Sequence, residues 1–355
     1  MRVWILTYVA PTSGAGGVER FVANLKTTLD EAGHDVNVLS ATSARRPFEI
    51  RPIRAWLLGN RVNKLSTRND LIICDGYFSW NANRDRSIIV YHGTELGRAI
   101  ATSGTTNPFR NLAVRVLNSR LDRKAGHGRT IVAVSNATKA EIENLYGLRV
   151  DAVISNGIDL DTFKPVADKE TLRTALGLPQ DRFLVLYVGT PDPRKGYEFL
   201  VEDVLPRLPS SHRLIVTTEM KTTMEGVIAV GRVDFAHIVR YYQACDAFVM
   251  PSAYEGCSYA LAEAMACGLP SVVSSTGSAR DMLADSTLAK YVISKNNAEA
   301  YAERLRSLEE SIEERKLASE ASRRFAEEQF DIRDFRNRYA DLVKSVAGGH
   351  EKERR

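Results

Sequence analysis

The chain has 355 residues, of which 44% are hydrophobic and 26% are charged; this is typical of a soluble globular protein long enough for two domains. No apolar run approaches the roughly 18 residues that a membrane-spanning helix needs, so no such helix is expected. Residues 1–150 carry 21 Lys and Arg against 12 Asp and Glu, a net +9, whereas the remainder carries 27 against 32, a net −5. Two interpretations stay open: the first half meets an anionic partner, or its surface is simply well solvated.

The first half alternates strands and helices. After the first strand, Gly14 to Gly17 predict a tight loop, and apolar residues from Val18 to Leu29 then recur at helical spacing. This start is interpreted as a strand and not as a signal peptide. The βα alternation predicts a doubly wound parallel sheet. The predicted strands are Val3–Tyr8, Val36–Leu39, Leu71–Cys74, Ser87–Tyr91, Thr130–Val134 and Ala152–Ile154.

The second half repeats this style. Pro and Gly residues in 165–181 mark the expected boundary, so the predicted domains are 1–165 and 166–332. Both are expected to be Rossmann-like α/β domains that face each other across a cleft, with the ligand at the strand carboxyl ends. Helices are expected over about 297–347, then a disordered charged tail from His350 to Arg355. The predicted strands are Phe183–Val188, Arg213–Thr217, Val227–Val230, Ala247–Met250 and Ser271–Ser274.

The stretch around Glu255 and Glu263 carries the chemistry. Ser258 is a good N-cap for a helix from Tyr259 to about Cys267, and Gly268 suits its left-handed stop. Glu255 then lies in the preceding loop, and Glu263 lies just over one turn into the helix. Between them is a helix N-terminus whose N–H groups and dipole favour phosphate. The arrangement predicts a nucleotide-sugar site; the alternative is a loop acid and an ordinary helix salt bridge.

This stretch closely resembles the E-x7-E signature of family 4 retaining glycosyltransferases, which have the GT-B fold. Cys257, Ser258 and Tyr259 stand where the family usually has Phe, Gly and Leu. The resemblance covers nearly the whole chain. It implies a metal-independent, retaining enzyme of the hexosyltransferase type that uses a UDP-sugar or GDP-sugar and no cofactor. It also implies that a helix at 333–347 packs back on the first domain.

Two motifs of the first half fit the resemblance. Gly16 and Gly17 belong to a G-G-x-E/x-R turn that the family places near the donor phosphates. The loop is not a dinucleotide fingerprint, because Glu19 stands at the position of the third glycine. His92 follows a strand directly, and the family's histidine at this place approaches the donor sugar near O6. For the glycine loop the alternative is an ordinary tight strand–helix turn, and for His92 it is a core histidine.

Two motifs of the second half are basic. Arg194 and Lys195 follow its first strand and could stabilise a diphosphate leaving group. Thr190 stands where many family members have an arginine, so Arg194 is the candidate replacement. Arg232 and Val233 resemble the segment whose backbone binds the nucleotide base. The alternative for Arg194 and Lys195 is a solvated charged turn.

The resemblance assigns these residues roles. Glu263 holds the ribose diol, and Glu255 binds sugar hydroxyls. Lys195, Arg194 and the backbone of Gly256, Cys257, Ser258 and Tyr259 hold the diphosphate. His92, Lys195 and Glu255 form the catalytic group, and no residue is a covalent nucleophile. The predicted acceptor is a hydroxyl of a glycan or lipid-linked glycan in surface polysaccharide or glycoconjugate synthesis. A sugar-nucleotide epimerase and a non-catalytic sugar-nucleotide-binding relative remain alternatives.

Metal, nucleic acid and membrane are the other partner classes. The four cysteines and six histidines show no ligand spacing, which favours reduced thiols in a cytoplasmic protein. Asp159 and Asp161 form a D-x-D pattern, but its linker context argues against a metal. No nucleic-acid-binding module is recognisable. The basic stretch 109–124 is expected to pack its apolar face on its own sheet. For 51–65, such packing and peripheral contact with an anionic membrane at its inner face both stay open. The oligomeric state is not assigned.

Overall fold

The computed structural model describes residues 1–9, 16–42, 51–104, 108–190, 192–218, 224–294 and 297–352. Gly14 and Ala15 of the glycine loop lie outside these residues. The chain forms two compact units, Met1–Gly157 with Arg333–Arg355, and Ile158–Ile332. Among the described residues, no helix is long and apolar enough to cross a membrane.

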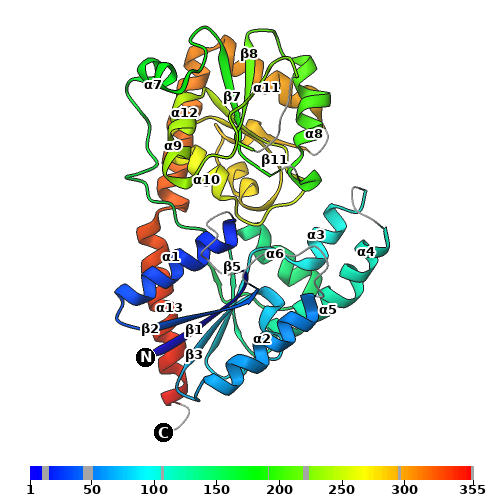
Figure 1. Ribbon diagram of the computed structural model, residues 1–355, viewed down its shortest axis with the longest axis vertical. Helices are drawn as coiled ribbons and strands as arrows, with labels where there is room; N and C mark the ends of the chain where they lie inside the picture. Colours follow the sequence, from blue (N-terminus) through cyan, green and yellow to red (C-terminus); the bar gives the residue numbers. More distant parts are fainter. Residues whose placement is uncertain are drawn as a thin grey trace. The chain divides into compact units, whose positions relative to one another are not determined.

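The first unit is built on six parallel strands in the order β2-β1-β3-β4-β5-β6 (Figure 1). Each strand overlaps a predicted one, because these segments are short apolar runs that the sheet buries. The elements are β1 (Arg2–Val9), α1 (Gly17–Glu31), β2 (Asp35–Thr42), α2 (Arg51–Leu65), β3 (Leu71–Asp75), η2 (Gly76–Ser79), β4 (Ser87–Tyr91), α3 (Glu95–Ala101), α4 (Pro108–Ala113), η3 (Val114–Asn118), α5 (Ser119–Gly126), β5 (Thr130–Ala133), α6 (Asn136–Tyr146) and β6 (Ala152–Val153).

The second unit holds six parallel strands in the order β12-β11-β10-β7-β8-β9. Only the two-residue strand β12 was not predicted. The elements are α7 (Lys169–Leu176), β7 (Phe183–Tyr187), η4 (Pro193–Lys195), α8 (Tyr197–Phe199), η5 (Leu200–Val204), η6 (Leu205–Arg207), β8 (His212–Val216), β9 (Val227–Ala229), α9 (Phe235–Ala244), β10 (Ala247–Met250), α10 (Tyr259–Ala266), β11 (Ser271–Ser274), η7 (Gly277–Ala284), η8 (Ala289–Tyr291), β12 (Val292–Ile293), α11 (Ala298–Glu310) and α12 (Ile312–Gln329).

The division between the units lies at 157/158, earlier than the predicted 165/166. Ile158 already belongs to the second unit, since it forms a β-bridge with Asp331. The Phe163 ring lies 6.1 Å from that of Tyr242 in α9. The glycine that suggested a linker, Gly177, instead ends α7 in the left-handed conformation.

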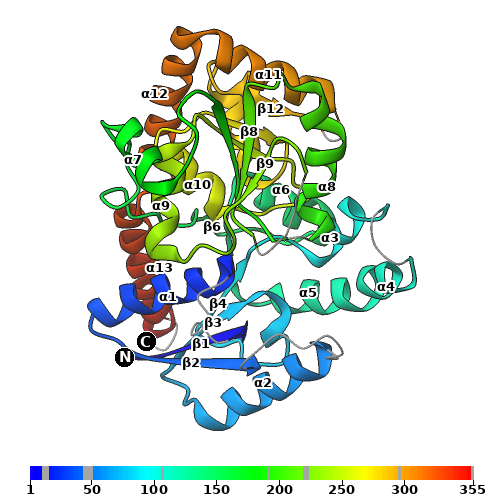
Figure 2. The same ribbon diagram turned by 45° about the horizontal axis from the view of Figure 1, so that its top comes forward.

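The last helix, α13 (Ile332–Lys352), packs on the first unit through an aromatic cluster. The Phe21 ring of α1 lies 5.8 Å from the rings of both Phe335 and Tyr339. Figures 1 and 2 show α13 running beside α1. The helix reaches beyond His350, where a disordered tail was predicted, and residues 353–355 lie outside the described part.

The prediction that 109–124 packs its apolar face on its own sheet is wrong for most of that face, although Leu121 packs against the hydrophobic core. Leu112, Val116 and Leu117 are exposed, while Asn111 and Asp122 are buried. These polar side chains can be buried because they are hydrogen-bonded within the unit. The helix α2 buries apolar residues on one side but also exposes apolar residues on the other. It buries residues such as Leu58 and Val62 in the core but leaves Ile53, Trp56 and Leu57 exposed.

Candidate functional site

The strand order of the second sheet favours one edge position as a candidate binding site. Counted from β7, the spatial order is 3-2-1-4-5-6, and the direction of winding reverses between β7 and β10. In doubly wound sheets, ligands bind beyond the carboxyl ends of the strands at such a reversal. The loops that leave β7 and β10 carry Arg194, Lys195 and Glu255. These three predicted residues therefore share the position that the topology favours.

Two cations converge on one carboxylate oxygen at this point. Lys195 Nζ lies 2.7 Å from Glu255 Oε1, and Arg194 Nη1 lies 3.2 Å from the same atom. The Arg194 guanidinium also donates to the carbonyl oxygen of Tyr254 at 2.8 Å. The Glu255 side chain is only 10% exposed, whereas those of Arg194 and Lys195 are 26% and 23% exposed. The cations thus lie on the more accessible side of a buried anion.

The pKa of Glu255 reflects this pairing. Burial by itself raises the pKa of this carboxyl, but the charges of Lys195 and Arg194 overcome burial and hold the pKa below its ordinary value. Glu255 is therefore a carboxylate at neutral pH. It can accept hydrogen bonds from hydroxyl groups but cannot serve as a general acid.

Tight backbone packing fixes both loops. Gly196 has φ +73°, and a Cβ there would come within 2.3 Å of the Pro251 carbonyl oxygen. The Ala253 N–H donates to the Arg194 carbonyl at 2.8 Å, which ties the loop after β7 to the loop after β10. On the other side, a Cβ on Gly277 would lie 2.3 Å from the Gly256 carbonyl oxygen. Only glycine permits these approaches, so the cluster is held by backbone as well as by charge.

Helix α10 begins at the predicted cap. The Ser258 hydroxyl accepts a hydrogen bond from the Leu261 N–H at 3.4 Å, and Gly268 has the predicted left-handed φ of +68°. The N-terminal end of α10, with its positive dipole, adjoins the backbone of Gly256 and Cys257. This is the local geometry expected for a diphosphate pocket.

Glu263 is 3% exposed within α10, and its Oε2 accepts a hydrogen bond from the Tyr242 hydroxyl at 2.8 Å. Tyr242 was not singled out from the sequence. Its contact depends on how α9 packs against α10, which no local pattern encodes. Arg232, exposed, and Val233, half-buried, lie in the loop after β9. This loop is three strand spacings, about 14 Å, along the edge from β10.

The first sheet has its own reversal, between β1 and β3 in the order 2-1-3-4-5-6. Thr7 on β1 donates to Asp75 at the end of β3 at 3.3 Å. His92 directly follows β4, and its Nε2 lies 3.8 Å from Asp75 Oδ1, too far for a hydrogen bond. Among the described residues, this buried Nε2 has no hydrogen-bond partner. The predicted His92 thus lies at the favoured edge of the first unit, beside a carboxyl group that was not predicted.

Burial dominates the protonation of this pair. Burial raises the pKa of Asp75 to about 7. The hydrogen bond from Thr7 lowers this pKa, and the charge of the nearby Glu19 raises it further. Burial lowers the pKa of His92 to about 4. Both shifts favour the neutral form. Asp75 could have been noticed in the sequence, because it directly follows the predicted strand Leu71–Cys74.

The glycine turn after β1 packs around Glu19. Gly16 is the N-cap residue of α1, and a Cβ there would lie 2.0 Å from Glu19 Oε2. Glu19 is 3% exposed, whereas Gly17 is exposed. The Phe21 ring, two residues after Glu19, contacts the His92 ring edge-on at 4.6 Å between centroids. Gly16, Glu19, Asp75 and His92 therefore form one neighbourhood in the first unit.

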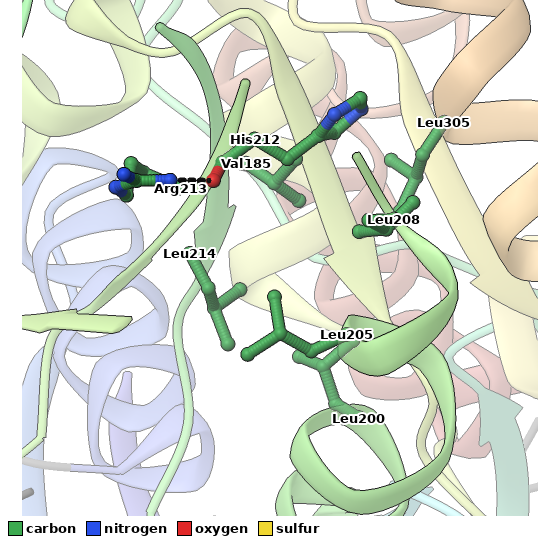
Figure 3. A pocket seen from close by; sticks show the side chains of 8 residues that line it. All are labelled: Val185, Leu200, Leu205, Leu208, His212, Arg213, Leu214 and Leu305. Atoms are coloured by element: carbon green, nitrogen blue, oxygen red, sulfur yellow. Dashed lines mark hydrogen bonds between the residues drawn. The ribbon is translucent and has the colours of Figure 1, made fainter. Parts of the chain in front are cut away.

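Two other described features of the second unit do not form ligand sites. A cavity of about 10 Å³ lies among leucine side chains such as Leu200, Leu205 and Leu214, while the Arg213 guanidinium points away from them and donates to the His212 carbonyl at 2.7 Å (Figure 3). It could hold about one water molecule, so it is a packing gap. Asp159 of the D-x-D pattern accepts hydrogen bonds from Thr162, in a turn. No group of three or more potential metal ligands occurs in the described part of the chain.

Comparison with known proteins gives the family. Residues 15–162 match the sequence model of Glycosyltransferase Family 4, and residues 182–311 match that of Glycosyl transferases group 1. D-inositol 3-phosphate glycosyltransferase from Xylanimonas cellulosilytica is 30% identical over 329 residues, covering 77% of this chain and 79% of the relative.

Two solved structures share the fold. Sucrose-phosphate synthase from Thermosynechococcus elongatus has a TM-score of 0.82 at 19% identity and covers 98% of this chain and 100% of its own. Anabaena HepE in complex with UDP has a TM-score of 0.72 at 20% identity. The match covers 97% of this chain and 100% of the HepE chain. The chain belongs to the family 4, group 1 glycosyltransferases and is a glycosyltransferase with the GT-B fold.

Proposed function

We propose that this glycosyltransferase binds a nucleotide-diphosphate sugar at the carboxyl edge of the second sheet and transfers the sugar with retention of configuration. The observation that carries this proposal is the convergence of Lys195 and Arg194 on buried Glu255 at the reversal of strand order. Anabaena HepE, which has the same fold, was solved in complexes with UDP and with UDP-glucose. A UDP-sugar or GDP-sugar is the proposed donor.

The chemistry assigned to the second unit is leaving-group stabilisation. The bond between sugar C1 and the diphosphate oxygen breaks, and a bond between C1 and the acceptor oxygen forms on the same face. The acceptor's proton passes to the departing phosphate oxygen. Lys195, Arg194 and the N-terminus of α10 stabilise the charge that develops on the diphosphate. These groups supply the positive charge without a metal ion, so metal-independent transfer is part of the proposal.

The carboxylates orient the donor. Glu255, ionised and pinned by two cations, accepts hydrogen bonds from sugar hydroxyls. Glu263, with the Tyr242 hydroxyl as a fixed neighbour, accepts from the ribose diol. Backbone groups of Gly256–Tyr259 bind the diphosphate, and the loop at Arg232 and Val233 binds the base. Orientation of this kind can supply several kcal/mol of the barrier reduction.

The first unit contributes polar groups near its own reversal. His92, neutral and with an unsatisfied Nε2, suits a hydrogen bond to a donor-sugar hydroxyl. The Phe21 ring packs against the imidazole, and Gly16 and Gly17 allow close backbone approach to phosphate. The proposed acceptor is a hydroxyl of a glycan or glycolipid. The net charge of +9 on residues 1–150 favours an anionic or lipid-linked one.

The test is product stereochemistry. The purified protein is incubated with UDP-, GDP- and ADP-sugars and candidate hydroxyl acceptors, with and without EDTA, and the anomeric configuration is read by proton NMR. The expected product keeps the donor's configuration, at an equal rate in EDTA. An inverted product would exclude retention, and complete loss of turnover in EDTA would exclude metal independence. Donor epimerisation without an acceptor would replace transfer by the epimerase alternative.

A further inference from the structure

The helical segment α4–η3–α5 (108–126) exposes its apolar side. The exposed fractions are 84% for Phe109, 59% for Leu112, 52% for Leu117 and 45% for Val116. These side chains recur at the spacing of one helix face. Exposed apolar residues are ordinary when scattered singly, but a contiguous stripe marks an interaction surface.

The buried side of the same segment includes polar side chains that are hydrogen-bonded. Asn111 donates to the Ala99 carbonyl at 2.8 Å. The carboxyl of Asp122 accepts from the Tyr146 hydroxyl at 2.7 Å and from the Glu95 N–H at 3.0 Å. These polar contacts attach the segment to its unit together with Leu121 and Ala125, which pack in the hydrophobic core. The exposed apolar side chains from Phe109 to Leu117 do not belong to that core.

A π-helical turn, η3, produces this orientation. In a regular α-helix, Asn111 and Ser119 would point about 80° apart, because eight residues make about two turns and a fifth. The π-turn takes an extra residue, which returns Ser119 to the side of Asn111. Both are buried, and the stripe from Leu112 to Leu117 faces outward as a result.

The exposed charged side chains of the segment are cations. Residues 96–128 contain six Arg and Lys and one acid, Asp122. Arg115, Arg120, Arg123 and Lys124 are exposed, whereas Asp122 is buried. Burial raises the pKa of Asp122 to about 8, with the nearby Glu95 adding to the rise, so this carboxyl is mostly neutral at pH 7. The outward charge of the segment is therefore positive.

Helix α2 presents a second stripe of the same character on the same side of the sheet. Its inner residues and Ala125 of α5 belong to one hydrophobic cluster on one face of the sheet, and Figures 1 and 2 show both helices on the side away from α1 and α13. The outward residues of α2 include Ile53, Trp56 and Leu57. Residues 51–65 contain four Arg and Lys and no acid.

We propose that the outward faces of α2 and 108–126, here named the basic-apolar face, dock on an anionic lipid bilayer. Leu, Phe, Val and Trp side chains suit shallow insertion at the headgroup boundary, and Arg and Lys pair with lipid phosphates. A protein partner is less favoured, because the centre of a protein interface is depleted in charge, whereas here cations interleave with the apolar residues. The inference concerns binding alone and does not need the proposed sugar transfer to hold.

The test is co-sedimentation of the full chain with phosphatidylcholine vesicles, with and without about one third phosphatidylglycerol. Three proteins are compared: the wild type, the double variant Leu112→Ser/Leu117→Ser, and Ile312→Ser/Leu317→Ser as control. Ile312 and Leu317 are 73% and 60% exposed on α12 of the second unit, so both pairs remove exposed apolar side chains at little cost to folding.

The wild type and control are expected to bind anionic vesicles, less well as salt rises. The Leu112/Leu117 variant is expected to lose at least tenfold in partitioning while keeping its thermal shift with donor nucleotides. Arg120→Glu/Arg123→Glu should weaken binding further, since each cation near an anionic surface contributes about fivefold. Absence of vesicle binding, or equal binding by all variants, would overturn the proposal. A change of oligomeric state in the Leu112/Leu117 variant, without vesicle binding, would assign the face to a second copy.

Discussion

Glu255 and Asp75 occupy equivalent places in the two units but have opposite electrostatics. Asp75 ends a parallel strand and Glu255 follows one, in each case where the strand order reverses, and each side chain is mostly buried. The pKa of Glu255 lies below its ordinary value, while that of Asp75 is raised to about 7. The neighbours explain the difference: Lys195 and Arg194 contact Glu255, whereas Asp75 faces Thr7 and a neutral His92. The strand order places a carboxyl group at the same position in both units, and the neighbouring cations decide whether that carboxyl group is ionised.

The comparison assigns different chemistry to the two edges. The second unit keeps two cations and one anion at the reversal, which suits a charged diphosphate. The first unit keeps a neutral imidazole and a carboxyl close to half-protonation, which suit uncharged hydroxyl groups. This assignment can be tested by removing a cation from the edge of the second sheet or by replacing a member of the neutral pair at the edge of the first sheet.

The largest effect is expected for Lys195→Met. Loss of a cation that stabilises the leaving group should lower kcat by about 10²- to 10³-fold. Lys169→Met is the matched control. Lys169 and Arg173 also pair with one carboxylate, that of Asp246, at 3.2 Å and 2.5 Å, but Asp246 directly precedes β10 at the opposite edge of the sheet. Steady-state kinetics should show a large loss for Lys195→Met alone; equal losses in both would mean that the ion pairs act only through stability.

The pH dependence of stability should reveal the neutral pair in the first unit. Between pH 4 and 6.5 the folded state keeps the proton on Asp75 while the unfolded state releases it, so this group makes stability fall as pH rises. For His92 the folded state is deprotonated while the unfolded state still binds a proton, so stability rises. Each contribution amounts to about 3 kcal/mol over this range, and the two oppose each other.

Single substitutions should separate them. In Asp75→Asn the free energy of unfolding should increase from pH 4 to 6.5 relative to the wild type, and in His92→Gln it should decrease. Urea denaturation at several pH values measures both slopes. Profiles that stay parallel in all three proteins would show that neither pKa is shifted.

A smaller effect is expected for Gly277→Ala. A Cβ there meets the Gly256 carbonyl at 2.3 Å, so the loop that carries Glu255 must move, and kcat/KM should fall about tenfold or more. Gly177→Ala is the control, because Gly177 has a similar positive φ of +65° but no atom within 4 Å of the added Cβ. It should lose about 1 kcal/mol of stability with unchanged kinetics. Equal losses of kcat/KM in Gly277→Ala and Gly177→Ala would contradict the inference that packing at Gly277 holds the loop of Glu255.

Sequence reasoning predicted the local features well. Strands appear as short apolar runs, and the cap at Ser258 and stop at Gly268 follow from single residues. It assigned Lys195 and Glu255 separate roles but not their direct contact, because pairing across 60 residues depends on which strands become neighbours. The Tyr242 contact has the same non-local origin.

The segment 108–126 shows why a correct pattern can give a wrong face. Its apolar residues do recur at helical spacing, which normally indicates the buried side. Here Tyr146, Glu95 and the Ala99 carbonyl satisfy Asp122 and Asn111, so the polar side can be buried instead. Such partners come from distant parts of the chain, and a single helix pattern cannot contain them.

The central claim is that the second unit binds a nucleotide-diphosphate donor around the reversal between β7 and β10. The most direct measurement is a thermal-shift series with UDP, GDP, ADP and their sugars on the wild type, Glu263→Ala and the Ile312→Ser/Leu317→Ser control. A ligand that binds only the folded state raises the melting temperature. We expect one nucleotide family to raise it in the wild type and control but not in Glu263→Ala. No shift with any nucleotide, or an equal shift in Glu263→Ala, would contradict the assignment.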